Sequence, residues 1–416
     1  MKALKLLAVA FIAAAAFIST ASAQTKIYIT GSTAFRSATV NAITSTLSGT
    51  VTTASDNASL TSANAVTWTG GNIGGTAVTI KASWSGAVGG GQTVAGSLSV
   101  RFLPDGATGT ANADPRTVGN PAEVAIPDIA MTDNLQSSTP FTGGSLVNGG
   151  PATYATLTDN AVGVVSFTWA ASVGFPTGKS MTKQLAQYQL GGTGSVPLAF
   201  YTGLTADQAT LAGATGVVYA TGRDPDSGTR VQTLAESGYG VFNNVNQWKP
   251  TVSGSTITAL ALYPIQTING VSTGVVGNSG ESSGSTLRTY LTKTLTSSAY
   301  QNGETGPSYM ITYLGVSDFN QVSGSGAVAL NWNGVPFSQT AIMNGQYTFW
   351  GYEHIMWRPT LGNGTTGGPV VKLTFGNNLK NTILASTSAT LSPNVALSDM
   401  AVTRTGDGGP ILNPNF

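Results

Sequence analysis

Residues 27–35 read Ile-Tyr-Ile-Thr-Gly-Ser-Thr-Ala-Phe, and residues 217–230 read Val-Val-Tyr-Ala-Thr-Gly-Arg-Asp-Pro-Asp-Ser-Gly-Thr-Arg. In both stretches a short run of β-branched and aromatic residues ends near a glycine, and Ser or Thr then precedes a run of helical spacing. This order is typical of a strand that passes through a tight turn into a helix capped by a hydroxyl side chain. Its occurrence twice in one chain decides the fold class that we expect.

The remaining pattern alternates predicted strands with predicted helices. The predicted strands cover 27–30, 77–80, 98–100, 162–169, 217–220 and 311–316, with strand-like stretches at 347–357 and, more weakly, at 66–69, where Gly70 and Gly71 follow. The predicted helices cover 34–47, 205–211 with Thr205 as its cap, and the residues from Ser227 to Ala235. A compact apolar run, 124–131, is interrupted by Pro127 and Asp128. Such alternation favours an α/β architecture.

Composition excludes several classes of protein. The 416 residues contain no cysteine and one histidine, His354, and only 8% of them are charged. A disulfide framework, thiolate metal sites and a cysteine nucleophile are therefore excluded, and so are multi-histidine metal sites. We accordingly expect no metal and no cofactor. The chain has no basic patch that would favour nucleic acid.

The first 23 residues have the pattern of a secretory signal. Lys2 and Lys5 form a basic start, residues 6–18 form an apolar run, and Ala21-Ser22-Ala23 resembles a cleavage site. The apolar run is shorter than the roughly 20 residues of a membrane span. Without residues 1–23 the chain has 16 basic and 17 acidic side chains. We expect an exported protein, periplasmic or extracellular, with no membrane span in the mature chain.

The two Ser/Thr-Gly turns are candidates for an oxyanion site. A helix N-terminus presents free backbone N–H groups and partial positive charge, and glycine lets an anion approach the backbone closely. Arg223 could add a bidentate, charge-assisted contact. The alternative is that Ser32, Ser227 and Thr229 are ordinary helix caps.

Three segments together resemble the PstS-like phosphate-binding protein family, whose members are type II periplasmic solute-binding proteins. Residues 29–35 are similar to the family's first phosphate-binding turn, and residues 128–133 are similar to its acidic segment, which ends in a ligand-binding aspartate. Arg223 followed by Ser227-Gly228-Thr229 is similar to its arginine and Ser-Gly-Thr cradle. Further similarity lies at 315–318 and at 344–354. Pro225 stands where the family usually has an acidic residue, which Asp224 or Asp226 could replace.

The resemblance implies a set of ligand-binding residues. They are Ser32, Thr33, Ala34, Ser85, Asp133, Arg223, Ser227, Gly228 and Thr229. Asp133 would accept a hydrogen bond from a protonated phosphate oxygen, which a fully deprotonated ion such as sulfate cannot donate. The alternative for Asp133 is a helix cap before Asn134-Leu135.

The resemblance also implies two α/β lobes that are joined by a hinge and bind the ligand between them. Lobe one would combine residues 24–160 with 315–416, and lobe two would be residues 161–314. The protein would then bind phosphate or a related oxyanion for uptake, pass it to an ABC permease, and catalyse no reaction. The alternative is a surface or structural assembly protein that reuses this scaffold with a weakened site.

Two short motifs raise the question of an enzyme. Residues 280–284, Gly-Glu-Ser-Ser-Gly, match the pattern of a hydrolase nucleophile turn, and residues 174–180 are similar to a phosphate-binding P-loop. The first has no clear strand before it, and His354 would be its one histidine base. The second has three residues between its glycines where the motif needs four. Neither pattern predicts an activity here.

Overall fold

The structure, a computed structural model, describes residues 24–143, 153–364 and 367–413. The predicted export signal, residues 1–23, lies outside this part of the chain. Within the described ranges, none of the helices is long and apolar enough to cross a membrane. The same ranges contain no cluster of His, Asp or Glu side chains that could hold a metal ion.

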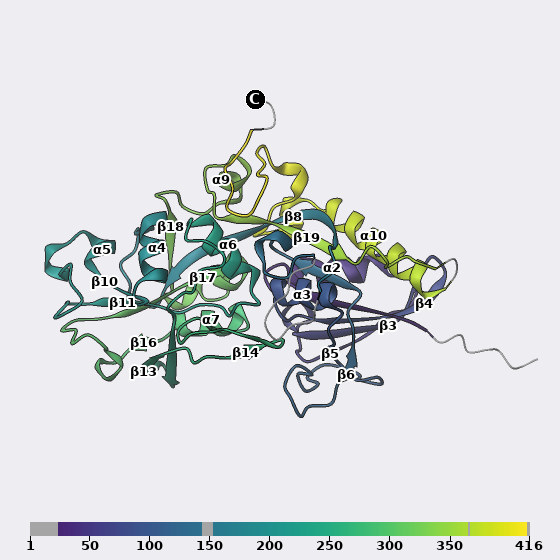
Figure 1. The fold of residues 1–416 in the computed structure, drawn as a ribbon, viewed down its shortest axis with the longest axis horizontal. Coiled ribbons are helices and arrows are strands. Elements are labelled where there is room, and N and C mark those ends of the chain that lie inside the picture. The colour runs from purple at the N-terminus through teal and green to yellow at the C-terminus, as the bar shows by residue number, and fades with distance from the viewer. Residues whose placement is uncertain (1–23, 144–152, 365–366, 414–416) are drawn as a thin grey trace, which may run out of the picture.

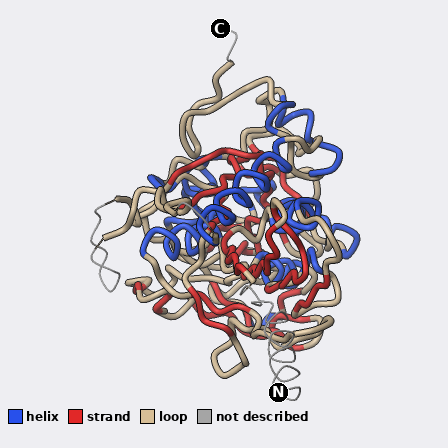
Figure 2. The backbone as a smooth tube through the Cα atoms, turned by 90° about the vertical axis from the view of Figure 1, so that its right-hand side faces the viewer, coloured by secondary structure: helices blue, strands red, loops and turns tan. Residues whose placement is uncertain are grey.

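One large mixed sheet runs through the molecule. Its order is β10-β11-β17-β8-β19-β7-β1-β4-β3-β2, and β18 and β9 are attached beside β8. The bounds are β1 (Thr25–Gly31), β2 (Thr52–Ser55), β3 (Ala65–Ile73), β4 (Thr76–Ser83), β7 (Ile129–Thr132), β8 (Thr158–Ala171), β9 (Ser180–Met181), β10 (Ser195–Pro197), β11 (Val217–Ala220), β17 (Tyr309–Gly315), β18 (Val328–Trp332) and β19 (Trp350–Trp357). Helices lie around these strands, which run through the middle of the molecule (Figure 2).

Three small sheets and ten helices complete the described part of the chain. The small sheets are β5 (Val100–Phe102) with β6 (Glu123–Ala125), β14 (Thr267–Ile268) with β15 (Val271–Ser272), and β12 (Trp248–Ser253), β13 (Thr256–Leu262) and β16 (Thr294–Leu295). The helices are α2 (Arg36–Thr46), α3 (Ala87–Gly96), α4 (Lys183–Gly191), α5 (Ala199–Thr202), α6 (Gly228–Glu236), α7 (Gly284–Leu291), α8 (Val316–Asn320), α9 (Gln339–Met343), α10 (Gly368–Leu384) and α11 (Ser388–Leu391).

Strand β8 divides the sheet into two halves and belongs to both. Its residues 158–166 pair with β19, and its residues 167–171 pair with β17. β1, β3 and β4 lie on one side of this junction, and β10 and β11 lie on the other (Figure 1). The predicted α/β class and its two-part architecture are therefore confirmed, whereas the lobe boundaries near residues 160 and 315 and the hinge stay predictions.

Parallel pairing places three strand ends at one edge of the first half. β1 pairs in parallel with β4 and with β7, so that the carboxyl ends of all three strands face the same way. The loops that follow these ends begin at Ser32, Trp84 and Asp133. α3 packs on β7 and β1 at this edge. The fold thus brings together segments about 50 residues apart in sequence.

The structure corrects three details of the predicted elements. The helix expected at 205–211 is only a 3-10 turn, Thr205–Asp207, because the side chains there find little core to pack against and Leu204 is exposed. The strand expected to end before Gly70 continues as β3 to Ile73, through an irregular register between Thr69 and Gly71. The strand expected at 98–100 begins at Val100.

Gly31 is fixed by the close approach of β1 and β7. Its φ is +123°, and a methyl group built on it would lie 2.0 Å from the Met131 carbonyl oxygen, which also accepts a hydrogen bond from the Ser32 N–H at 2.7 Å. A side chain here therefore meets both an unfavourable backbone conformation and a backbone clash.

We predict that Gly31→Ala lowers the free energy of unfolding by about 3 kcal/mol or more. Denaturant unfolding of the purified variant measures this loss. Gly324→Ala is the matched control, since nothing lies within 4 Å of a methyl group there. Equal stability of the two variants would contradict the packing described for Gly31.

Candidate functional site

Backbone groups from both halves meet at the ends of β1 and β4. The Gly86 N–H donates to the Gly31 carbonyl at 3.0 Å, just before α3 begins. Two amides in the first turn of α3, those of Val88 and Gly89, donate to the carbonyl of Asp226 at 2.9 and 3.2 Å. The N-terminal end of α3 is thereby joined to the turn that precedes α6.

Asp133 lies at this junction, against the N-terminus of α6. A methyl group built on Gly228, the first residue of α6, would lie 1.7 Å from Asp133 Oδ1 and 2.7 Å from the Ala87 side chain. Asp133 is 1% exposed, and its Oδ1 atom has no hydrogen-bond partner among the residues that the structure describes. A buried carboxyl oxygen with no partner is costly, so it marks a position that could serve a ligand.

Glu353 is a second buried acid beside Asp133. It lies in β19 and is fully buried, and within the described residues its carboxyl oxygens make no hydrogen bond of good geometry, although the Ser32 hydroxyl lies close to them. Burial raises the pKa of Glu353 well above its usual range, the charge of Asp133 raises it further, and the Ser32 hydroxyl opposes these effects. The protonated form of Glu353, which can donate a hydrogen bond, therefore persists to higher pH than in an exposed glutamate.

The pKa of Asp133 is raised to about 7, chiefly by burial. Its own backbone N–H and the positive charge of Arg223 act in the opposite direction, while Asp407 raises the pKa. Near neutral pH, Asp133 can therefore either donate or accept a proton. Together, Asp133 and Glu353 form the acid site discussed below.

Arg223 lies near the acid site, but its guanidinium is bound to backbone. Nε donates to the Glu281 carbonyl at 3.0 Å, and Nη2 donates to the Ser282 carbonyl at 2.8 Å. The side chain is 2% exposed. Its charge therefore reaches Asp133 through space, without a direct hydrogen bond in the structure.

The structure brings some of the predicted site residues together and leaves others apart. It brings Ser32, Asp133 and Gly228 to the acid site, with Arg223 close enough to act on Asp133 electrostatically. Ser85 lies at the end of β4, where its Oγ is 3.2 Å from the Thr30 hydroxyl.

The hydroxyl residues of α6 and the start of α2 are placed as follows. Ser227 is the N-cap of α6 and accepts from the Arg230 N–H at 3.3 Å, which confirms its reading as a helix cap. Thr229 is buried in the first turn of α6, and Thr33 is buried before α2. Ala34 packs against Gly315 from the other half.

Asp133 is not a helix cap, contrary to the alternative considered for it. The turn that follows it, Gln136–Ser138, begins after Leu135 and has no side-chain cap.

The serine of the hydrolase-like motif, Ser282, precedes α7, whereas the His354 ring is held by Asp159, with 2.7 Å between Nδ1 and Oδ1.

Sequence reasoning left Glu353 out of the site. The available signal was a carboxylic acid in an otherwise apolar and aromatic strand, Trp-Gly-Tyr-Glu-His-Ile-Met-Trp at 350–357. Such a residue is rarely buried unless it is paired or functional. Glu353 lies near Asp133 because β19 pairs with β7, with His354 opposite Thr132. Local sequence patterns do not reveal that pairing.

Comparison with known proteins gives similar folds only. No protein-family model matches the chain, and no curated protein matches it. A solved structure from Clostridium perfringens, described as that of a phosphate ABC transporter substrate-binding protein with bound phosphate, is 12% identical with a TM-score of 0.41, over 87% of this chain and 93% of that one.

Two further structures are similar at the same low level. An ABC-type phosphate transport receptor from Vibrio cholerae is 12% identical with a TM-score of 0.38, over 86% of this chain and 97% of that one. PstS from Borrelia burgdorferi is 10% identical with a TM-score of 0.37, over 90% and 99%.

We predict that stability falls as the pH rises from about 4 to about 7. Asp133 keeps its proton in the folded state up to about pH 7 but loses it near pH 3.8 when unfolded. Between these pH values deprotonation stabilises the unfolded state relative to the folded state. Asp133→Asn should remove this contribution and raise the free energy of unfolding at pH 8 by about 2–4 kcal/mol. Denaturant unfolding at pH 4.5 and pH 8 measures both effects.

Asp399→Asn is a control of opposite sign. A hydrogen bond from Ser388 lowers the pKa of the exposed Asp399 carboxyl, so its stabilising contribution is present above about pH 4. Its substitution should therefore give no gain at pH 8. An Asp133→Asn variant that is less stable than the wild type at pH 8 would contradict the placement of Asp133 as an unpartnered acid.

Proposed function

We propose that the protein binds a tetrahedral oxyanion, phosphate or a related ion, between the two halves of its sheet. The observation that carries this proposal is the acid site: among the described residues, the buried Asp133 Oδ1 has no hydrogen-bond partner and lies against the N-terminus of α6, and the buried Glu353 carboxyl is near enough for the charge of Asp133 to act on it. A helix start supplies free N–H donors and partial positive charge. The acids supply further hydrogen-bonding groups to the same point.

The protonation of the acids favours an ion that carries a proton. A protonated Glu353 would donate a hydrogen bond to an oxyanion, and an ionised Asp133 would accept one from a protonated oxygen. Monohydrogen phosphate has both kinds of oxygen. Sulfate has no proton at neutral pH, so it leaves an ionised Asp133 facing negative charge.

Binding requires the two halves to separate and close again. Asp133 belongs to the first half and Gly228 to the second, and the two are in contact. An ion can reach the N–H groups of α6 only when this contact opens. The ion would then be held by the start of α6, the Ser32 hydroxyl and the acids. Arg223 would attract it through space without a direct hydrogen bond.

The proposed biological role is that of an exported solute-binding protein that delivers its ion to an ABC permease. The secretory pattern of residues 1–23 and the resemblance of the three ligand motifs support this role. We propose no chemical step, because the role needs only capture and release. A hinge between the halves would couple capture to closure.

A second candidate is a scaffold protein in which the site no longer takes an ion. The observation that favours it is the position of the Asp133 carboxyl, which already fills the space against Gly228. In that case the acid itself lies at the helix N-terminus, where a carboxylate is favourable. The protein would then act in surface or structural assembly.

Thermal unfolding with added anions separates the two candidates. We expect phosphate and arsenate at 100 times the dissociation constant to stabilise the protein at pH 8 by about 2.7 kcal/mol, seen as a rise in Tm of several degrees. Sulfate should have little effect at pH 8. At pH 5, where Asp133 is protonated, discrimination between phosphate and sulfate should become small.

Matched variants assign the effect to the acid site. Asp133→Asn should abolish the preference for phosphate over sulfate at pH 8, whereas Asp207→Asn, in the 3-10 turn far along the chain, should leave it intact. Calorimetric titration confirms stoichiometry. If no tetrahedral ion shifts the melting temperature at either pH, oxyanion binding is wrong and the scaffold candidate stands.

A further inference from the structure

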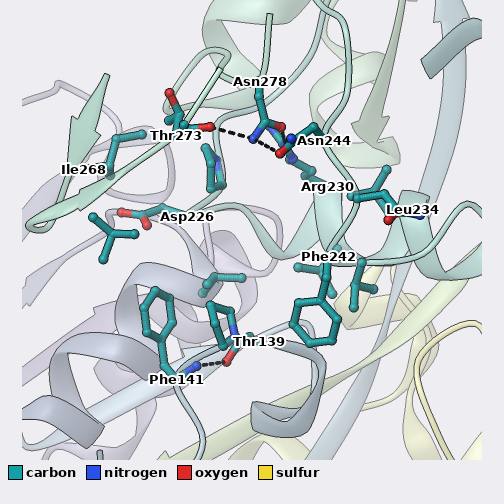
Figure 3. A pocket seen from close by; sticks show the side chains of 18 of the residues that line it. Thr139, Phe141, Asp226, Arg230, Leu234, Phe242, Asn244, Ile268, Thr273 and Asn278 are labelled. Carbon is teal, nitrogen blue, oxygen red and sulfur yellow. Dashed lines mark hydrogen bonds between the residues drawn. The ribbon is translucent and has the colours of Figure 1, made fainter. Parts of the chain in front are cut away.

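A cavity of about 380 Å³ lies beside α6 and does not include the acid site. Its walls come from α6, residues 241–244, the β14–β15 hairpin and residues 138–141 (Figure 3). We call it the α6 cavity and define it by six of its lining residues. These are Phe141, Arg230, Leu234, Phe242, Val271 and Asn278.

The α6 cavity has a polar end and an aromatic end. Arg230, Asn244 and Asn278 lie together at one end, and Phe141 and Phe242 lie at the other (Figure 3). Phe242 is 66% exposed although it borders the cavity. A large apolar side chain left partly in water at a cavity mouth is available for contact with a ligand.

The charge of Arg230 is buried without a direct ionic partner. The side chain is 5% exposed, Nη1 donates to the Arg223 carbonyl at 3.2 Å, and Nη2 donates to Asn278 Oδ1. Both acceptors are neutral. In the described ranges no carboxylate oxygen lies within ion-pair distance of this guanidinium, whereas Arg404, which is also buried, is paired with Glu236. Arginine keeps its charge when buried, so an anion in the cavity would offset a real cost.

Among the described residues, the acids near Arg230 form no ion pair with its guanidinium. Asp224 acts on Arg230 only through space, and its Oδ1 accepts from the Asp226 N–H at 3.1 Å. Asp226 lines the cavity and accepts from Asn269 at 2.7 Å. Burial, with the charge of Asp224 adding to it, raises the pKa of Asp226 well above its usual range. A raised pKa lowers the charged fraction of Asp226 and, with it, the repulsion that an anion in the cavity would meet.

We propose that the α6 cavity binds an organic anion with a flat apolar body, an aryl carboxylate, whose carboxylate meets Arg230 and whose ring lies between Phe141 and Phe242. The planar guanidinium fits a carboxylate, and the apolar walls fit a ring. The cavity volume is in the range of small-molecule sites, roughly 300–1,000 Å³. This inference does not depend on the oxyanion function, because Asp133 and Glu353 do not line the cavity.

Calorimetric titration of the whole protein with 2-naphthoate tests the proposal. We expect saturable binding of one molecule per chain. The neutral analogue 2-naphthylmethanol has the same ring but no charge, and it should bind at least tenfold more weakly. Inorganic phosphate at millimolar concentration should not displace 2-naphthoate, which separates this cavity from the acid site.

Variants locate the binding. Val271→Glu places a negative charge on the cavity wall and should weaken 2-naphthoate binding at least tenfold. Val252→Glu is the matched control, because Val252 is 40% exposed in β12 and does not line the cavity. Arg230→Gln should remove the preference for 2-naphthoate over its neutral analogue. If that variant does not fold, Val271→Glu and Phe242→Ser decide the question.

Three results would overturn the proposal. The first is that 2-naphthoate does not bind the wild type at millimolar concentration. The second is that it binds Val271→Glu and Phe242→Ser as well as it binds the wild type. The third is equal affinity for 2-naphthylmethanol, which would show that Arg230 does not recognise the charge. Asp133→Asn should leave 2-naphthoate binding unchanged, so failure here and failure of oxyanion binding are distinguishable.

Discussion

Close backbone packing at glycine is the constraint on which the centre of the molecule depends. Gly31 lets β1 lie against the carbonyl of Met131, and Gly86 lets the start of α3 lie against the carbonyl of Asp226. Gly228 lets the acid Asp133 reach the start of α6. Where no side chain intervenes, strand ends and helix starts from the two halves meet through their main chains, and the polar groups of those main chains become available at one point.

Because few residues are charged, each buried ionisable group has a large effect on the electrostatics around it. Only 8% of the residues are charged, yet Asp133, Glu353, Arg223 and Arg230 are all nearly inaccessible to water. Burial disfavours the charged form of an acid, and it leaves an arginine charged but poorly solvated. Burial therefore shifts Asp133 and Glu353 toward their neutral forms, while Arg223 and Arg230 keep their charge.

The sequence allowed part of this arrangement to be predicted. The turns at Ser32 and Ser227 are local patterns of a few residues, so both could be identified from the chain alone, whereas Asp133 is identified through the resemblance of residues 128–133 to a family segment. Glu353 and Arg230 could not be identified from the sequence. The place of Glu353 is set by long-range strand pairing, and Arg230 looks like any polar residue of an amphipathic helix until the cavity beside it is known. Tertiary contacts, and not local propensity, decide such positions.

Strand β8 has a consequence for how the chain reaches this state. Residues 158–166 pair with β19, nearly 200 positions later in sequence, and Val164 also bonds to Val395. The first half of the sheet is thus incomplete until residues 350–357 are available to pair with β8. Contacts of such long separation slow folding, so we expect the docking of β19 on β8 to be a late step.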